Sequence, residues 1–225
     1  YRPFSKRVWR IDDAKFFPDV MPRALNVAQT GRPGVVFLDV PMDVFQQEVD
    51  APVTNVARRP NYPRATGDAA GIETAAALIA AATAPVLYVG NGVLLSDACD
   101  EVRALAELAQ LPVATTLIGK GAFPETHPLA VGMTGIWGTR TANQTTSAAD
   151  LVIAVGTGFG EADCSSWTPG VTFSFPKTKL IQIDIEPEEI GKIYKVDVGI
   201  VGDAKATLRA LITALHARGT LSTDT

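Results

Sequence analysis

The sequence contains few of the residues that build disulfide frameworks or metal centres. Its 225 residues include two cysteines, Cys99 and Cys164, and two histidines, His127 and His216. Two cysteines are too few for a disulfide framework, so we expect one to be a small buried apolar residue and the other a loop thiol. The histidines lack the spacing to cysteines or carboxylates that a metal site needs. The pattern therefore predicts no metal centre within this chain.

Positive charge is sparse and dispersed. The 20 lysines and arginines are outnumbered by 24 aspartates and glutamates, which gives a net charge of −4, and no basic cluster exceeds two adjacent residues. This distribution argues against nucleic acid or an anionic membrane surface as a partner. Long apolar runs are also missing, because Thr83 and Pro85 interrupt the alanine-rich stretch 75–90 before it reaches the ~20 residues of a membrane span. With no recognisable signal peptide, we expect a cytoplasmic protein.

Short apolar runs alternate with helical patterns along the chain. We expect strands at 35–40, 85–89, 111–114, 151–155, 180–185 and 198–201. Helices are expected at 19–29, 71–84, 96–109, 139–149 and 188–193, with Ser96 as an N-cap, and a last helix follows Asp203. The strands are continuously apolar rather than half polar, which is typical of a parallel sheet covered on both faces. The sequence therefore predicts an α/β fold with a doubly wound parallel sheet and right-handed crossovers.

Four regions follow from this pattern. Residues 1–45 offer one helix and one strand, which cannot bury their own faces, so we expect them to dock on another structure. Residues 46–70 are rich in proline and turn formers and are predicted to be a linker that runs over a surface. The main domain is expected from 71 to 218, and the polar tail 219–225 is expected to be disordered.

A stretch rich in glycine, threonine and proline, residues 111–138, lies in the middle of the main domain. After its short strand it holds Thr115 and Thr116 and then five glycines, Gly119, Gly121, Gly132, Gly135 and Gly138. Glycines let the backbone approach a ligand closely, and a compact domain seldom keeps so long a loop without a use for it. We expect no regular structure after the strand. The stretch is either a ligand loop or a structural crossover.

Small and polar residues follow four of the predicted strands. They are Gly90-Asn91-Gly92, Thr115-Thr116, Gly156-Thr157-Gly158, and Asp184 together with the later Asp203. The carboxyl ends of parallel strands share one edge, where glycine amides can face a phosphate and a carboxylate can bind a ribose or an adenine. No G-x-G-x-x-G motif is present, so each segment could also be a tight turn. Their convergence on one edge favours a nucleotide site.

Catalytic machinery is harder to recognise. No Ser/His/Asp set, metal cluster or Walker loop has an interpretable spacing, and His127 in the segment PETHP is expected in a turn. On its own residues, the chain is predicted to be a binding or structural domain and not a complete enzyme.

Longer segments carry a more specific signal. They are GRPG with VVFLDVPMDV, PVLYVGNGV, LPVATTLIGKGAFPETHPLAVGMTGIWGTR, ADLVIAVGTGF and LIQIDIEPEEIGKIYKVDVGIVGDAK, in this order from residue 31 to residue 205. Together these segments resemble the thiamine-diphosphate enzymes of the acetolactate (acetohydroxyacid) synthase group, and the GKGAFPETHPL match is highly specific. The resemblance implies that the main domain is the Rossmann-like central one of three α/β domains.

The resemblance also implies what lies outside this chain. Residues 1–45 correspond to the last helix and strand of a preceding pyrimidine-binding domain. In the family, the glutamate that activates thiamine lies upstream, and the GDG-type motif that holds Mg²⁺ and the diphosphate lies downstream. We therefore expect the parent enzyme to act on 2-oxo acids with thiamine diphosphate and Mg²⁺, to contain adjoining pyrimidine- and diphosphate-binding domains, and to form homo-oligomers. The fragment alone is expected to be inactive.

Family members that contain FAD carry its nucleotide portion in this domain. The matching positions here are Gly90, Asn91, Gly92, Thr116, Leu117, Gly135, Ile136, Gly156, Thr157, Asp184, Ile185, Asp203 and Ala204. The synthases usually read G-A-R-F-D-D-R after the strand LVIAV, whereas Gly156–Ala162 contains neither arginine, and Trp137 replaces a usual histidine. Cations that face a pyrophosphate are lost with these arginines. FAD, another nucleotide such as ADP, and an empty relic site remain open, as do a free-standing nucleotide-binding module and a structural spacer.

Overall fold

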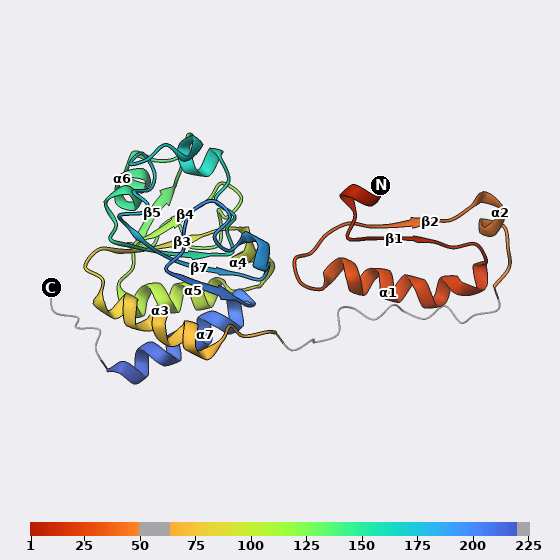
Figure 1. The fold of residues 1–225 in the computed structure, drawn as a ribbon, viewed down its shortest axis with the longest axis horizontal. Coiled ribbons are helices and arrows are strands. Elements are labelled where there is room, and N and C mark those ends of the chain that lie inside the picture. The colour runs from red at the N-terminus through yellow and green to blue at the C-terminus, as the bar shows by residue number, and fades with distance from the viewer. Residues whose placement is uncertain (50–63, 220–225) are drawn as a thin grey trace. The chain divides into compact units, whose positions relative to one another are not determined.

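The computed structural model describes residues 1–49 and 64–219. The chain divides into two compact units, Tyr1–Pro63 and Arg64–Thr225 (Figure 1). The division falls inside the predicted linker 46–70, most of which, like most of the predicted tail, lies outside the described residues. Each unit is therefore described by itself.

The first unit is a small sheet with one long helix beside it (Figure 1). Strand β1, Arg7–Arg10, pairs in parallel with β2, Val36–Asp39, and helix α1 spans Phe17–Gln29. Short helices η1 (Arg2–Phe4), η2 (Ala14–Phe16) and α2 (Met42–Phe45) complete it. Within residues 1–49 the buried positions are few, namely Ile11, Ala14, Ala24 and Val44. This unit buries little of its own surface.

The second unit is built on a parallel sheet, as predicted, with six strands where the sequence predicted five. The strands are β3 (Pro85–Val89), β4 (Val113–Thr115), β5 (Ala130–Met133), β6 (Leu151–Val155), β7 (Lys179–Asp184) and β8 (Val198–Val201). Their order across the sheet is β5-β4-β3-β6-β7-β8. Starting from β3, the chain winds outward to one edge and then returns to wind outward to the other. This is the doubly wound order, and it places a topological switch point between β3 and β6.

Two strands were not predicted, β1 in the first unit and β5 in the second. β5 lies within the stretch after Thr116 for which the sequence predicted no regular structure. It pairs with β4, and the register shifts between Val113 and Ala114, where Gly132 adopts a φ of +97°. A glycine tolerates this left-handed conformation at an irregular pairing. The prediction was wrong because a four-residue strand that contains a glycine has no clear alternating pattern.

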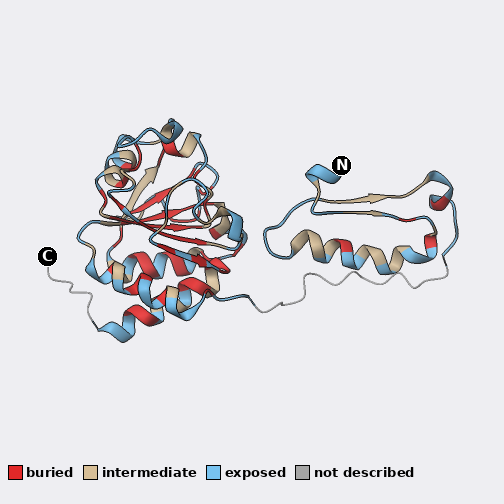
Figure 2. Cartoon of the chain, viewed as in Figure 1, coloured by how far each residue is buried: buried red, intermediate tan, exposed pale blue. Residues whose placement is uncertain are grey.

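Helices cover one face of the sheet and loops with a short helix cover the other (Figure 1). Helices α3 (Ala69–Ala81), α5 (Cys99–Ala109) and α7 (Ala204–Arg218) pack on one face, and α6 (Arg140–Ala148) lies on the opposite side. Side chains of each strand alternate between two cores, so that Leu87 and Val89 join the helix side while Val86 and Tyr88 join the other. The sheet is accordingly buried along most of its length (Figure 2).

The turn between β3 and α5 differs from the prediction. Ser96 is not the N-cap of α5, because a separate short helix, α4 (Asn91–Leu95), ends at Ser96 and α5 begins at Cys99. Asp97, predicted in the first turn of a helix, stands between the two helices with a φ of 54°. The helix predicted at 188–193 is only a 3₁₀ turn, η4, Pro187–Glu189. A second irregular segment, η3, spans Ala162–Trp167.

No helix in the described parts of the chain is both long enough and apolar enough to cross a lipid bilayer.

Candidate functional site

The predicted site residues all follow strands of one parallel sheet. Gly90, Asn91 and Gly92 follow β3, Thr116 and Leu117 follow β4, Gly135 and Ile136 follow β5, Gly156 and Thr157 follow β6, Asp184 and Ile185 end β7, and Asp203 and Ala204 follow β8. Because the strands are parallel and adjacent, their carboxyl ends meet at one edge. The structure thus brings these residues to the same side of the sheet, although they span six strands.

At the switch point the glycines pack against one another. A Cβ added to Gly92 would lie 2.6 Å from the Cα of Gly156, and a Cβ on Gly156 would meet Gly92 at the same distance. The amide of Gly90 donates to the Val155 carbonyl at 3.0 Å, and the amide of Gly92 donates to the Gly156 carbonyl at 3.0 Å. These glycines therefore let two strand ends approach closely, and both amides are engaged within the protein rather than aimed at a phosphate.

The loops after β4 and β5 are held by residues that the sequence did not identify. Asp163 accepts a hydrogen bond from the amide of Leu117 at 2.8 Å. Asn143 exchanges two bonds with Gly135, accepting from its amide at 2.9 Å and donating to its carbonyl at 3.0 Å. The amide of Ile136 donates to the carbonyl of Ala162 at 2.9 Å. Asp163 lies 46 positions from Leu117 in sequence, so no local pattern marks it, whereas Asn143 lies eight positions after Gly135, in the helix that follows the loop.

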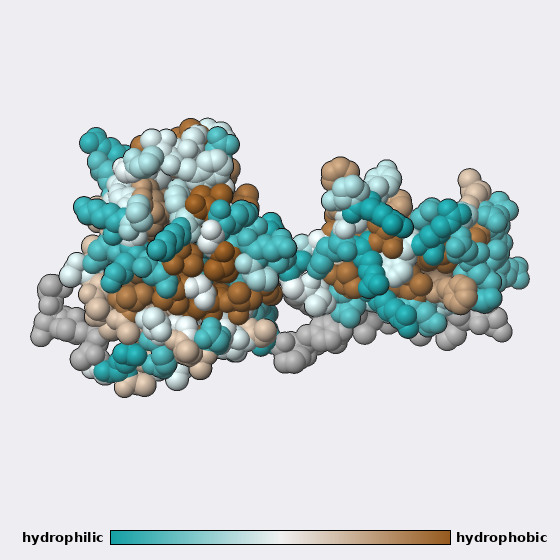
Figure 3. Space-filling model, viewed as in Figure 1, coloured by the Kyte–Doolittle hydropathy of each residue, from teal (hydrophilic) through white to brown (hydrophobic). Residues whose placement is uncertain are grey.

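Large apolar side chains are exposed at this edge. Leu117 and Ile118 follow β4, Ile136 and Trp137 follow β5, and Ile185 follows β7; Ile118 and Trp137 are 68% and 67% exposed. Apolar groups also reach the surface of the second unit in the view of Figure 3. Single exposed apolar residues are ordinary, but several that follow neighbouring strands indicate a surface that contacts a flat or apolar group.

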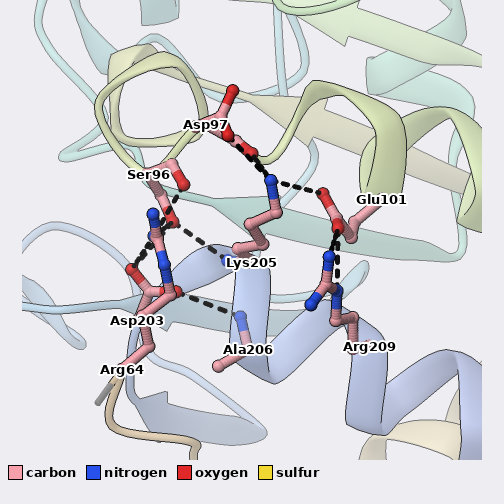
Figure 4. A network of polar contacts seen from close by, with 8 residues as sticks. All are labelled: Arg64, Ser96, Asp97, Glu101, Asp203, Lys205, Ala206 and Arg209. Carbon is pink, nitrogen blue, oxygen red and sulfur yellow. Dashed lines mark hydrogen bonds and ion pairs between the residues drawn. The ribbon is translucent and has the colours of Figure 1, made fainter. Parts of the chain in front are cut away.

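Asp203, predicted to bind a ribose or an adenine, is part of a polar network (Figure 4). It caps α7, since its Oδ1 accepts from the amide of Ala206 at 3.0 Å. Its Oδ2 accepts from Arg64 Nη1 and from Ser96 Oγ, each at 2.8 Å. The residue is 7% exposed. Both carboxylate oxygens therefore already serve contacts within the chain.

The same network extends along α7 (Figure 4). Lys205 Nζ contacts the Oδ2 of Asp97 at 2.8 Å, and this hydrogen bond lowers the pKa of the Asp97 carboxyl. Arg209 Nε donates to Oε1 of the buried Glu101 at 2.9 Å, while the other oxygen of Glu101 lies 3.9 Å from Lys205 Nζ. These contacts fasten the turn between α4 and α5 to the start of α7.

The acid at the end of β7 supports its own turn. Asp184 Oδ1 accepts from the amide of Glu186 at 3.0 Å, and the Asp184 carbonyl accepts from the amide of Gly202 at 2.8 Å. Asp184 therefore joins the turn after β7 to the end of β8.

Comparison with known proteins connects this fold to one family. Residues 72–211 match the family described as "Thiamine pyrophosphate enzyme, central domain". The chain belongs to this family. A central-domain assignment also agrees with the relatives. The chain is 42% identical over 221 residues to a probable acetolactate synthase large subunit of Methanocaldococcus jannaschii, covering 96% of this chain and 37% of that protein. It is 41% identical over 216 residues to the acetolactate synthase large subunit of Corynebacterium glutamicum, covering 96% and 34%.

Solved structures support the same assignment. A putative thiamin diphosphate-dependent enzyme from Mycobacterium smegmatis is 29% identical with a TM-score of 0.74, covering 95% of this chain and 40% of that chain. A benzoylformate decarboxylase from Polynucleobacter necessarius is 25% identical with a TM-score of 0.73, covering 95% and 39%. The chain thus spans well under half the length of the proteins that it matches.

In residues 1–49 and 64–219, no group of three or more histidine, cysteine, aspartate or glutamate side chains could hold a metal ion. At Gly158, one of the positions where the resemblance leads us to expect arginine, a Cβ would lie 2.6 Å from the carboxylate of Glu189. That carboxylate is paired with Lys192, whose Nζ lies 2.5 Å from it.

Proposed function

We propose that this chain is the central domain of an acetolactate-synthase-like enzyme that joins or splits carbon–carbon bonds of 2-oxo acids, as a transferase or lyase. The observation that carries the proposal is the 42% identity to a probable acetolactate synthase over 96% of the chain. The similarity to a benzoylformate decarboxylase supports the broader class of 2-oxo acid chemistry.

Thiamine diphosphate, bound with Mg²⁺, supplies the carbanion stabilisation that this chemistry requires. We propose that its ligands belong to adjoining pyrimidine- and diphosphate-binding domains, in a cytoplasmic homo-oligomer. The first unit supports the presence of such a neighbour, because Tyr1, Phe4, Val35 and Phe45 are all more than half exposed. Large apolar groups exposed in this number favour contact with another protein surface.

The role of this chain is then to hold its neighbours and, as a second function, to bind the flat part of a ligand at the carboxyl edge of the sheet. The thirteen predicted site residues, of which Gly90 is the first and Ala204 the last, remain our proposal for that edge. The exposed Ile118, Ile136 and Trp137 favour a ring-binding surface over a bare spacer. FAD and ADP are the candidate ligands.

Pyruvate consumption tests the main proposal. A protein that contains this chain together with both adjoining domains should consume pyruvate only when thiamine diphosphate and Mg²⁺ are present. The 225-residue chain should show no turnover under the same conditions. Turnover by the isolated chain, or a longer protein that ignores thiamine diphosphate, would refute the proposal.

A further inference from the structure

A segment after β6 binds two other loops of the carboxyl edge. Asp163, in η3, accepts a hydrogen bond from the amide of Leu117 through Oδ1 at 2.8 Å, and its backbone carbonyl accepts from the hydroxyl of Thr134 at 2.9 Å. The carbonyl of the preceding Ala162 accepts from the amide of Ile136 at 2.9 Å. Leu117 follows β4, whereas Thr134 and Ile136 follow β5. One short segment thus connects the loops of two neighbouring strands.

The contact between η3 and the loop after β5 leaves no room for a side chain. Gly135 has a φ of +91°, and a Cβ at this position would lie 2.6 Å from the Cα of Asp163. Gly135 also exchanges two backbone hydrogen bonds with the side chain of Asn143. The loop after β5 is therefore held by Asn143 and by η3 together, and its position depends on where Asp163 lies.

The segment that carries Asp163 has a strained backbone. Ser165, Ser166 and Trp167 follow one another with φ values of 49°, 54° and 55°, in the left-handed region that residues other than glycine seldom adopt. Such strain persists only where the surrounding contacts over-determine it, and it is concentrated at functional sites. Trp167 Nε1 donates to the carbonyl of the buried Phe159 at 2.9 Å. The core thus holds η3 in one conformation and fixes Asp163 in place.

The two loops that contact Asp163 carry exposed apolar side chains. Leu117 and Ile118 follow β4, and Ile136 and Trp137 follow β5. Side chains that contact a flat ring bind it more tightly when they are already ordered, because ordering them on binding costs affinity. Asp163 contacts the first loop through its side chain and the second through its carbonyl, so it can order both before a ligand arrives.

We propose that Asp163 is a positioning residue of the ligand-binding edge, which holds the loops after β4 and β5 so that their exposed side chains form one ring-binding surface. This inference rests on the ligand-binding role proposed above for that edge, with FAD or ADP as the ligand. Asp163 acts through the two loops and does not touch the ligand. A loss of affinity on its substitution should therefore accompany a change in the free chain.

Hydrogen exchange and calorimetric titration of the 225-residue chain test this proposal. In Asp163→Ala the amide of Leu117 loses its acceptor, so its exchange in the free chain should become about tenfold faster. Affinity for FAD, or for ADP if the wild-type chain binds ADP more tightly, should fall about tenfold, which is the scale of one hydrogen bond. Asp163→Asn keeps an oxygen acceptor and should restore both values to within about twofold of wild type.

Asp197→Ala is the matched control. Asp197 Oδ2 accepts from the amide of Leu180 at 2.9 Å, near the amino end of β7 and away from the ligand-binding edge. Each alanine variant loses one hydrogen bond between a carboxylate and a backbone amide, so the two variants should lose similar thermal stability. Only Asp163→Ala should lose affinity, and this difference separates positioning from a general loss of stability.

Four results would overturn the proposal, and they can be told apart. Unchanged exchange of the Leu117 amide in Asp163→Ala would show that other contacts hold the loop after β4. Unchanged affinity in Asp163→Ala, or an equal loss in Asp197→Ala, would reject positioning and keep the ligand-binding edge. Equal losses of affinity in Asp163→Ala and Asp163→Asn would assign the carboxylate to ligand contact instead. Absence of FAD and ADP binding by the wild-type chain at millimolar concentration would reject the ligand-binding edge itself.

Discussion

Removing the ion pair between Arg64 and Asp203 should measurably destabilise the second unit. In Asp203→Ala, α7 loses its N-cap bond to Ala206, which costs about 1 kcal/mol. The charge-assisted bond to Arg64 is worth about 1.5–3 kcal/mol when buried, but the Arg64 side chain is 38% exposed, so solvent screening lowers that value. We expect a total loss of about 2–3 kcal/mol, which corresponds to a fall in melting temperature of about 4–12 °C.

Urea unfolding with a double-mutant cycle isolates the pair itself. Asp203→Asn keeps an N-cap acceptor while removing the charge, and Arg64→Met removes the guanidinium but keeps much of the side-chain volume. The two single variants and the double variant should show a coupling free energy of about 1 kcal/mol or more.

The chain offers a matched control for the arginine. Arg103 pairs with Glu107 at the same 2.8 Å, but the two side chains are 55% and 46% exposed, so Arg103→Met should cost about 0–0.5 kcal/mol. If Arg64→Met costs no more than Arg103→Met, or if the coupling free energy is within error of zero, the network of Figure 4 does not stabilise the domain and our reasoning from burial is wrong.

Three further predictions concern a glycine at a strand end and two titratable groups, Cys164 and Asp150. Gly92→Ala should destabilise the second unit by about 1–3 kcal/mol in a urea titration, because the new Cβ would lie 2.6 Å from backbone. Gly160→Ala is the control and should be close to neutral, because the nearest neighbour of its Cβ would be a side-chain oxygen at 3.4 Å. Equal losses of stability in the two variants would contradict this prediction. Burial raises the pKa of Cys164 from 9.0 to about 12. The contribution of this thiol to folding stability should therefore be complete below pH 9 and decline as the pH rises from 9 towards 12. The native chain should also resist alkylation by iodoacetamide at pH 8, and rapid labelling of the native chain would contradict the burial of the thiol. For Asp150, burial raises the pKa, but hydrogen bonds from neighbouring backbone and hydroxyl groups outweigh this effect and lower the pKa below 3.8. The stability that these bonds confer is therefore present above pH 3.8 and lost below it. The free energy of unfolding should fall less between pH 7 and pH 3 in Asp150→Asn than in wild type.

The parallel sheet could be predicted because buried parallel strands need no polar face. β3 and β6 are continuously apolar, and β7 is interrupted within its run only by the buried Gln182. Each is followed by turn residues, so composition and order were sufficient. β1 and β5 lack this signal. β1 reads RVWR and β5 reads AVGM, and each is a strand because a neighbour supplies its hydrogen bonds. Tertiary pairing, which local sequence does not encode, decides both cases.

The candidate edge was predictable in position and not in detail. Parallel strands place their carboxyl ends together whatever their side chains, so the location of Gly90, Gly156 and Asp184 follows from topology alone. The partners of these residues do not. Gln182 reaches two loops, and Arg64 reaches Asp203 across 139 positions of sequence, so the hydrogen bonds that occupy this edge depend on the assembled fold.

The crowding around the glycines at this edge changes what those glycines indicate. A glycine after a strand can open space for a ligand or allow two strands to pack, and sequence cannot separate these roles. At Gly92 and Gly156 the space is filled by backbone, and at Gly158 it is filled by the Glu189 carboxylate. For the ligand site that we propose, Trp137 and Ile136 are therefore side chains that remain exposed for contact, at 67% and 57%. Ring stacking and apolar contact are the chemistry that these two side chains can supply.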